Sequence, residues 1–324
     1  MEPKNEPLIR TDVPEMVITR ILNAPRDLVF RIWTEPEHIK HWWGPNGFTN
    51  TISKMEFRPG GVWEFVMHGP DGTDYTNVNE FIEIIRPEKI VLKHVLNPVF
   101  TMTVTFEDTG DNKTILTIRN RFESREVFDN AVEKYGAAVG LKQNVDRMED
   151  YLYEKPKGRE LIITRELNAP KELVYQVWTQ KEHLAKWWGP KGFEIKVSKF
   201  DFQPGGTFLY SMAVPDGSEM IGLFVYHEIV QGEKVTFVNS FADKDGRITR
   251  APFSPSWPLE VYNELTFSEK NGKTTVVLKG GPIHATEEER NTFEGGFDSM
   301  NEGFAGTFEQ LEEYLLGMGK NNKI

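Results

Sequence analysis

The sequence has 324 residues, of which 39% are hydrophobic and 27% charged, with a formal net charge of −11 and no cysteine. This length is typical of two globular domains of about 150 residues each. The acidic balance argues against nucleic acid and anionic membrane surfaces, because both need a concentrated basic face on the protein. The absence of cysteine excludes disulfides, thiolate metal ligands and cysteine nucleophiles, and it fits a cytoplasmic protein. The first 15 residues lack the apolar core of a signal peptide, and no stretch approaches the roughly 18 apolar residues of a membrane span.

An internal repeat runs through the chain at a constant offset of 145 residues. Residues 16–72 align with residues 161–217 without a gap, and 29 of the 57 aligned positions are identical. The period is far too long for a solenoid, whose repeats span about 20–45 residues. The repeat therefore predicts a tandem of two complete domains.

The second copy is longer than the first between the matching segments at their two ends. The closing segments 140–152 and 303–315 align at an offset of 163, so the second copy has gained 18 residues, mostly across 242–258. A polar stretch containing Pro and Gly, which is typical of a linker, separates the copies. We expect an N-terminal tail (1–14), a first domain (15–154), a linker (155–158) and a second domain (159–318).

In chain order, each copy is expected to form one strand, two short helices, six further strands and a long closing helix. The proline of Asn-Ala-Pro suits the first turn of a helix, and Gly-Pro after the paired tryptophans ends the second helix. Turn sequences such as Pro-Gly-Gly and Pro-Asp-Gly separate the alternating segments that follow. We expect strands at 15–23, 48–57, 62–68, 74–85, 89–96, 99–107 and 113–122 in the first copy, and at 160–168, 193–202, 207–213, 219–230, 234–241, 259–268 and 273–279 in the second. The closing helices are expected at 125–153 and 286–316.

Several short motifs recur in the same order in both copies. They are Asn-Ala-Pro before the first helix, Trp-Thr at the end of that helix, Glu-His, Trp-Trp-Gly-Pro, Gly-Phe, Pro-Gly-Gly and Pro-Asp-Gly. Together with the order of the elements, they resemble the SRPBCC, or START-like, superfamily, and within it the family of the activator of the heat-shock-protein ATPase. The resemblance covers nearly the whole chain. It implies an α+β class with two tandem helix-grip domains, in which a curved antiparallel sheet wraps around the long C-terminal helix and often leaves a cavity.

Paired tryptophans, Trp42-Trp43 and Trp187-Trp188, stand just before the Gly-Pro turn in each copy. One interpretation places them at the mouth of a cavity or makes them a partner-binding anchor. The other makes them structural residues that fix the turn between helix and strand. We favour the structural role for at least one tryptophan of each pair.

His38 and His183 occupy the same place in the two copies. A general base needs an adjacent nucleophile or orienting group, and the sequence offers none at a fixed spacing, so we interpret both as helix-packing residues. No His-x-x-x-His or similar spacing indicates a metal site, and no glycine-rich turn leads into a helix as phosphate binding requires. We expect no catalytic residue, no metal and no cofactor.

The strands of the second copy combine many aromatic side chains with few polar ones, which is the usual make-up of a small-molecule pocket and equally of a solid core. The closing helix carries an apolar stripe at helical spacing, together with several glycines that would widen the space beside it. The insertion is long enough to act as a lid. We expect the larger cavity in this domain, walled by Tyr210, Met212, Phe224, Tyr226, Phe237, Asn239, Phe297, Met300 and Phe304, with Trp257 near its mouth.

Three functions fit these observations. The first is a non-catalytic binding protein that holds an apolar or aromatic small molecule, lipid- or polyketide-like, in that cavity. The second, implied by the family resemblance, is a co-chaperone or protein-interaction module whose partner is a chaperone. The third is a cyclase- or hydrolase-type enzyme that uses Asn239, Tyr226, Glu264 or His284 as polar groups. We favour the first, in the cytoplasm, with no nucleic acid partner and no membrane insertion.

Overall fold

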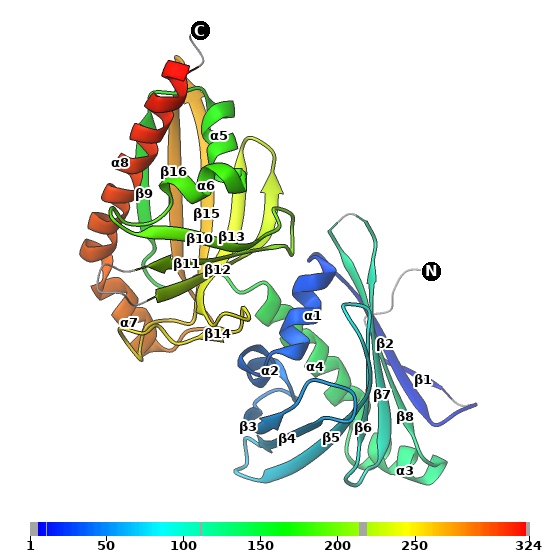
Figure 1. Cartoon of the computed structure of the whole chain (residues 1–324). Helices are drawn as coiled ribbons and strands as arrows, with labels where there is room; N and C mark the ends of the chain where they lie inside the picture. Colours follow the sequence, from blue (N-terminus) through cyan, green and yellow to red (C-terminus); the bar gives the residue numbers. More distant parts are fainter. Residues whose placement is uncertain (1–5, 11, 111, 214–218, 322–324) are drawn as a thin grey trace. The chain divides into compact units, whose positions relative to one another are not determined.

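The computed structural model describes residues 6–10, 12–110, 112–213 and 219–321. The Pro-Asp-Gly turn expected at 215–217 lies outside these residues. By its internal contacts the chain divides into two compact units, Met1–Tyr153 and Glu154–Ile324. In each unit an antiparallel sheet curves beside a C-terminal helical segment (Figure 1). The expected α+β class, with two tandem helix-grip domains, is confirmed.

The sheet of the first unit has, within the described residues, eight antiparallel strands in the order β1-β2-β8-β7-β6-β5-β4-β3. Their bounds are β1 (Leu8–Arg10), β2 (Glu15–Leu22), β3 (Thr49–Met55), β4 (Val62–His68), β5 (Asp74–Ile85), β6 (Lys89–His94), β7 (Phe100–Asp108) and β8 (Thr114–Phe122). The helical segments are α1 (Arg26–Thr34), α2 (Pro36–Trp42), α3 (Arg125–Asp129), the π-helical turn η1 (Asn130–Lys134) and α4 (Ala137–Leu152).

Two features of the first unit differ from the sequence prediction. The segment assigned to the N-terminal tail contains the edge strand β1, in which Ile9 lies opposite Met16 of β2. Three residues are too few to show the alternation that predicts a strand. The closing helix is also not continuous, because Gly136 takes a left-handed conformation, with φ of 64°, between η1 and α4. Glycine reaches this conformation without the steric penalty of a side chain.

The sheet of the second unit has the order β10-β11-β12-β13-β15-β16-β9, and β14 pairs with β13 outside this path. Its strands are β9 (Leu161–Leu167), β10 (Glu194–Phe200), β11 (Thr207–Ala213), β12 (Glu219–Val230), β13 (Lys234–Ala242), β14 (Ile248–Thr249), β15 (Glu260–Lys270) and β16 (Lys273–Ile283). Its helices are α5 (Lys171–Thr179), α6 (Lys181–Trp187), α7 (Glu287–Gly295) and α8 (Phe297–Asn321). The inserted residues thus supply the short strand β14 and the loop that follows it.

The closing helix of the second unit is likewise divided, here at Gly296 between α7 and α8. A Cβ atom at this position would lie 3.2 Å from the indole ring of Trp257. The glycine therefore allows the inserted loop to approach the helix junction closely. A periodicity of apolar residues alone does not reveal this break, because the spacing continues across it.

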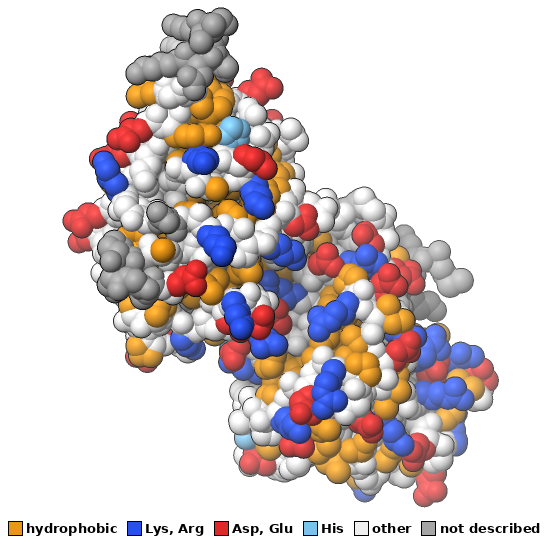
Figure 2. Space-filling model, in the orientation of Figure 1, with side chains coloured by type: hydrophobic (Ala, Val, Ile, Leu, Met, Phe, Trp, Pro, Cys, Tyr) orange, Lys and Arg blue, Asp and Glu red, His pale blue; other side chains and the backbone are white. Residues whose placement is uncertain are grey.

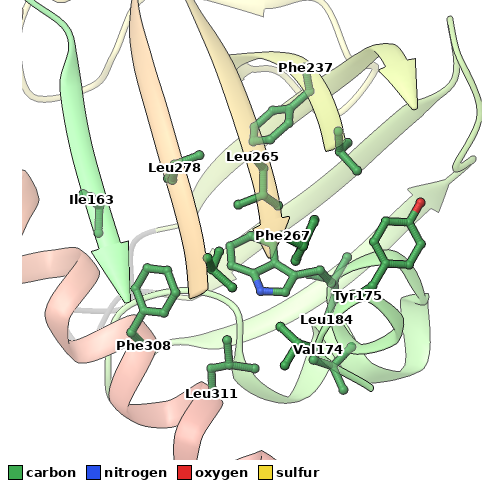
Figure 3. Packing of buried hydrophobic residues seen from close by; sticks show 14 of the residues in the cluster. Ile163, Val174, Tyr175, Leu184, Phe237, Leu265, Phe267, Leu278, Phe308 and Leu311 are labelled. Atoms are coloured by element: carbon green, nitrogen blue, oxygen red, sulfur yellow. The ribbon is translucent and has the colours of Figure 1, made fainter. Parts of the chain in front are cut away.

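The core of the second unit lies between the inner face of the sheet and α8. Figure 3 shows Phe308 and Leu311 of α8 directed towards Ile163 of β9 and Leu278 of β16. Each fully buried side chain of this size contributes about 1.5–3 kcal/mol. The apolar stripe expected on the helix is confirmed, since all its members belong to the core or pack against it: Phe293, Phe297, Met300, Phe304, Phe308, Leu311 and Leu315.

Charged side chains of both signs are interspersed on the drawn face of the molecule (Figure 2). Ion pairs join neighbouring segments of the second unit: Lys279 of β16 pairs with Glu160, which precedes β9, at 2.9 Å, and Lys234 of β13 pairs with Glu228 of β12 at 2.8 Å. Such exposed pairs contribute little to stability, typically below about 1 kcal/mol. In the described part of the chain, no helix is both long and apolar enough to cross a membrane.

Candidate functional site

A cavity of about 260 Å³ lies in the second unit between the inner face of the sheet and α8. Seven of the ten expected wall residues lie around it: Tyr210, Met212, Phe224, Phe237, Asn239, Met300 and Phe304. The strand residues among them share one face of β11, β12 and β13 because successive side chains of a strand alternate between faces. Met300 and Phe304 share one face of α8, four residues apart. Their role in ligand binding stays a prediction.

The other three expected residues are not among those that line the cavity. Tyr226 is buried in the core, where its ring packs edge-on against Phe202 with the centroids 4.9 Å apart. Trp257 packs against Phe293 of α7, with the centroids 5.5 Å apart. Phe297 stands in the first turn of α8, beneath the guanidinium of Arg159 at 5.2 Å. The inserted loop therefore covers the α7–α8 junction, and the placement of Trp257 near the cavity mouth stays a prediction.

Ten further residues line the cavity, and of these the sequence had indicated only Trp188, in one of the two interpretations of the paired tryptophans. They are Trp188, Gly189, Pro190, Gly222, Ser240, Phe241, Asn263, Leu278, Gly303 and Thr307. One signal was available: Gly222 stands in the middle of a strand, where glycine often marks the close approach of another group. A Cβ atom there would lie 2.5 Å from the ring of Tyr210, so the glycine makes room for that ring.

The turn after the paired tryptophans forms one side of the cavity, and α8 holds it in place. Thr307 donates a hydrogen bond from Oγ1 to the carbonyl oxygen of Gly189 at 3.1 Å, and Gln310 donates to the same oxygen at 2.6 Å. In the first unit, Arg147 holds the corresponding turn by donating to the carbonyl oxygens of Gly44 and Pro45. The closing helix thus fixes the Gly-Pro turn in each unit with different side chains.

The two tryptophans of each pair have different roles. Trp42 and Trp187 are almost fully buried, and the indole N–H of each donates to a main-chain carbonyl of the preceding helix at 3.1 Å. The structural role expected for one tryptophan of each pair is therefore confirmed. The second tryptophan of the second pair, Trp188, lines the cavity and packs edge-on against Phe224 at 5.5 Å.

Two asparagines supply the main polar groups of the cavity wall. Asn239 lies on β13 and Asn263 on the neighbouring strand β15. The side-chain nitrogen of Asn263 donates to Oδ1 of Asn239 at 3.0 Å and to the carbonyl oxygen of Val261 at 2.8 Å. The sequence alone indicates Asn239 but not Asn263, because pairing between strands decides which inward-facing residues meet.

The cavity carries no formal charge. Among the described residues that line it, none is a lysine, arginine, histidine, aspartate or glutamate. Its one titratable group is the hydroxyl of Tyr210, and burial raises the pKa of this hydroxyl to about 12. Because burial disfavours the charged phenolate, the side chain remains a neutral donor and acceptor at physiological pH.

The polar residues of the enzymatic alternative do not come together in the structure. Asn239 lines the cavity and Tyr226 lies in the core, whereas Glu264 follows Asn263 in β15 and so stands on the opposite face of the sheet. His284 bonds to Glu260 through Nδ1 at 2.8 Å. Within the described part of the chain, no group of three His, Asp or Glu side chains could hold a metal ion.

The first unit places a different set of side chains at the corresponding positions. The residues that align with Phe224 and Asn239 are Asn79 and His94. Both are buried, and Nδ1 of the histidine lies 3.0 Å from the amide oxygen of the asparagine. Burial lowers the pKa of His94. The interiors of the two units therefore differ chemically although their turns and folds agree.

The order of the elements, the sheet that curves beside a closing helix and the interior between them define a tandem of helix-grip domains of the SRPBCC type. The family model described as "Activator of Hsp90 ATPase homolog 1-like protein" matches twice, over residues 23–153 and residues 168–316. The chain belongs to this family. Domains of the family are ligand-binding or co-chaperone modules.

Solved structures resemble the chain one half at a time. A protein from Arthrobacter aurescens is 26% identical over 46% of this chain and 91% of its own, with a TM-score of 0.44. A protein from Mycobacterium smegmatis is 24% identical over 51% of this chain and 98% of its own, with a TM-score of 0.41. An AHSA1 protein from Silicibacter pomeroyi is 18% identical over 49% of this chain and 98% of its own, with a TM-score of 0.37. No curated protein matches the chain.

Proposed function

We propose that the second domain is a non-catalytic binding module that holds a compact apolar or aromatic molecule in the cavity between its sheet and α8. The observation that carries this proposal is the wall itself, in which aromatic and methionine side chains surround a few polar groups. This is the usual composition of small-molecule sites. Among the described residues that line the cavity, none pairs a nucleophile with a base, which supports binding rather than catalysis.

The size of the cavity favours a compact ligand. Its volume of about 260 Å³ falls just below the roughly 300–1,000 Å³ typical of ligand pockets. A molecule of one or two rings suits this space better than a long acyl chain does. The rings of Phe224 and Phe237 are stacked with centroids 4.4 Å apart, and that of Trp188 stands edge-on to the first of them. Aromatic surfaces in such arrangements add about 0.5–1.5 kcal/mol per ring pair beyond area burial.

A glycine in α8 allows the cavity to be obstructed without disturbing its other walls. Gly303 lines the cavity, and a Cβ atom added to it would meet nothing within 4 Å. Gly306 of the same helix also has open space at its Cβ position but does not belong to the wall. Gly303 is itself exposed, so we expect Gly303→Leu to place its side chain at the opening of the cavity and obstruct it, and Gly306→Leu is the matched control.

The experiment measures binding of naphthalene to the full chain by calorimetry and by the shift in melting temperature. We expect binding by the wild type and by Gly306→Leu, and at least a tenfold loss in Gly303→Leu, since a leucine side chain obstructs the opening of the cavity. Absence of naphthalene binding to the wild type, or equal binding by all three proteins, would contradict the proposal.

The family match supports a second candidate function, that of a co-chaperone acting on a heat-shock-protein ATPase. The observation that favours it is the match of the activator family over both units. An ATPase assay with a purified chaperone of the ninety-kilodalton class tests this role. A rise in ATPase rate that Gly303→Leu leaves unchanged would assign the activity to a surface of the protein and separate it from the cavity.

A further inference from the structure

The two asparagines of the cavity wall have fixed amide orientations. An amide nitrogen carries two hydrogens, and both hydrogens of Asn263 are used, one on Oδ1 of Asn239 and the other on the carbonyl oxygen of Val261. If the Asn263 amide were reversed, its oxygen would face these two acceptor oxygens. The observed orientation is therefore the one that the surrounding acceptors require.

The asparagine pair leaves one carbonyl oxygen and one amide nitrogen at the cavity wall. In the described part of the chain, no hydrogen bond occupies Oδ1 of Asn263 or the amide nitrogen of Asn239. The oxygen of Asn263 has room because residue 280, opposite it in β16, is glycine. A Cβ atom at Gly280 would lie 2.5 Å from that oxygen. The pair can thus offer a ligand the carbonyl oxygen of Asn263 as an acceptor and the two N–H groups of Asn239 as donors.

The surroundings of the two asparagines disfavour a charged ligand. A ligand carboxylate would lose its hydration on entering a wall without a lysine, arginine or histidine, and nothing there would compensate its charge. A purely apolar ligand would leave the two amide groups without partners. A hydroxyl group avoids both penalties, because one oxygen atom can donate one hydrogen bond and accept another.

We propose that the cavity of the second domain selects an uncharged aromatic molecule that bears a hydroxyl group. The hydroxyl donates to Oδ1 of Asn263 and accepts from the amide nitrogen of Asn239, while the ring lies among the aromatic side chains of the wall. The two asparagines are therefore specificity-determining residues. This inference rests on the proposed binding function and adds the chemical class of the ligand.

Four two-ring probes of similar size separate the possibilities on the full wild-type chain. They are 2-naphthol, naphthalene, 2-methoxynaphthalene, which keeps the acceptor but loses the donor, and 2-naphthoate, which carries a negative charge. Calorimetry should rank 2-naphthol about tenfold tighter than naphthalene and tighter than the methoxy compound, because only the hydroxyl satisfies both amides. The naphthoate should bind most weakly.

Variants of the asparagines test their assignment. In Asn239→Leu and Asn263→Leu the preference for 2-naphthol over naphthalene should fall to less than threefold, while naphthalene binding persists. Gly306→Leu, which lies outside the cavity wall, is the control and should keep the preference. Thermal unfolding checks that each variant is folded, and the ranking of the four probes on the wild type stands even if one variant fails to fold.

The outcomes distinguish this inference from the proposed function. If naphthalene and 2-naphthol bind the wild type equally, or if the naphthoate binds as tightly as the naphthol, the hydroxyl selectivity is wrong while the binding function stands. A preference for 2-naphthol that survives in both asparagine variants overturns the assignment of these residues. If none of the four probes binds the wild type, both the proposed binding function and the proposed selectivity for a hydroxyl group are wrong.

Discussion

Nδ1 of His183 lies 2.7 Å from the hydroxyl oxygen of Tyr314, and the same relationship recurs in the first unit, where Nδ1 of His38 lies 2.9 Å from the hydroxyl oxygen of Tyr151. Each pair joins the second short helix of its unit to the closing helix. The histidines shared by the two copies are thus helix-packing residues, as their sequence context predicts, and the bond orients the closing helix against the rest of the unit.

Breaking this bond should weaken the fold of the second unit without affecting the cavity. We expect His183→Leu and Tyr314→Phe each to lower the free energy of unfolding, with a coupling energy of about 0.5–1.5 kcal/mol in the double-mutant cycle. Urea denaturation of the wild type, the two single variants and the double variant measures this coupling energy. Neither residue lines the cavity, so naphthalene affinity should stay within twofold. A coupling energy near zero would show that the two side chains act independently.

Much of the fold could be predicted because local patterns agree with the tertiary structure. Strand β4 occupies the predicted range 62–68, and β13 extends the predicted 234–241 by one residue. In these segments inward-facing apolar residues alternate with others, and turn sequences bound them. The identity of the two copies in their turns also predicted the tandem of two domains without any three-dimensional information.

The features that could not be predicted from the sequence depend on contacts between segments that are distant in the chain. The division of the closing helix at Gly296 follows from the approach of Trp257, which lies 39 positions earlier in the chain. The hydrogen bond between Asn263 and Asn239 depends on the register in which β15 pairs with β13. That register cannot be predicted from the sequence, because the inserted residues lie between the two strands. Alternation places each asparagine on the inner face but does not say which residues meet there.

Substitution of the second tryptophan in each pair should have unequal effects. Trp43 is 8% exposed and packs edge-on against Trp33 and Trp42, so Trp43→Ala should lower the free energy of unfolding by about 3–5 kcal/mol. Trp188 is only partly buried and already borders a cavity, and Trp188→Ala should therefore cost less, about 1–3 kcal/mol. Thermal and urea unfolding measure both values.

Naphthalene binding provides the control for this comparison. It should weaken in Trp188→Ala, which removes part of the wall, and remain unchanged in Trp43→Ala, which lies in the other unit. A melting temperature of Trp43→Ala within a degree or two of the wild-type value would contradict the structural role assigned to that side chain.

Two glycines of the cavity wall should respond in opposite directions to the same substitution. Gly303→Ala should stabilise the protein by up to about 1 kcal/mol, because alanine favours a helix interior and its Cβ atom meets open space. Gly222→Ala should destabilise it, because the new Cβ atom would lie 2.5 Å from the ring of Tyr210. Differential scanning calorimetry of the two variants should show melting temperatures on either side of the wild-type value, and two shifts of the same sign would be inconsistent with these environments.

The burial of His94 should make the stability of the first unit pH-dependent. Because burial lowers the pKa of His94 in the folded state, the unfolded chain binds a proton first as the pH falls through about 6.5. Stability contributed by the neutral imidazole is therefore complete above that pH and declines below it, with a slope of at most about 1.4 kcal/mol per pH unit for one proton.

The substitution His94→Asn should remove this dependence. Asparagine is the residue at the corresponding position of the second unit, and it carries no titratable group. Urea unfolding at pH values from 7.5 to 5 measures the slope for both proteins, and the difference between them isolates the histidine from carboxylates that titrate at lower pH. Equal slopes for the wild type and the variant would show that this imidazole does not resist protonation in the folded state.

Separation of the two units should give two folded fragments, because each contains its own sheet, closing helix and core. The chain should not be cut within the linker expected at 155–158, because residues of this segment contact the second unit. Lys155 donates to the hydroxyl of Tyr262 at 3.0 Å with its ammonium group 4.1 Å from the ring centroid, and Pro156 lies close to Gly281. These linker residues therefore belong with the second unit, and the cut is best made between Tyr153 and Glu154.

We expect fragments 1–153 and 154–324 each to unfold cooperatively in calorimetry. A second version of the C-terminal fragment that starts at residue 158 should be less stable by about 0.5–1 kcal/mol, the contribution of one exposed cation–π contact. Lys155→Ala in fragment 154–324 is the matched control and should account for most of this difference. Loss of cooperative unfolding in both fragments would mean that the units share a core, and the division of the chain at residue 153 would then be wrong.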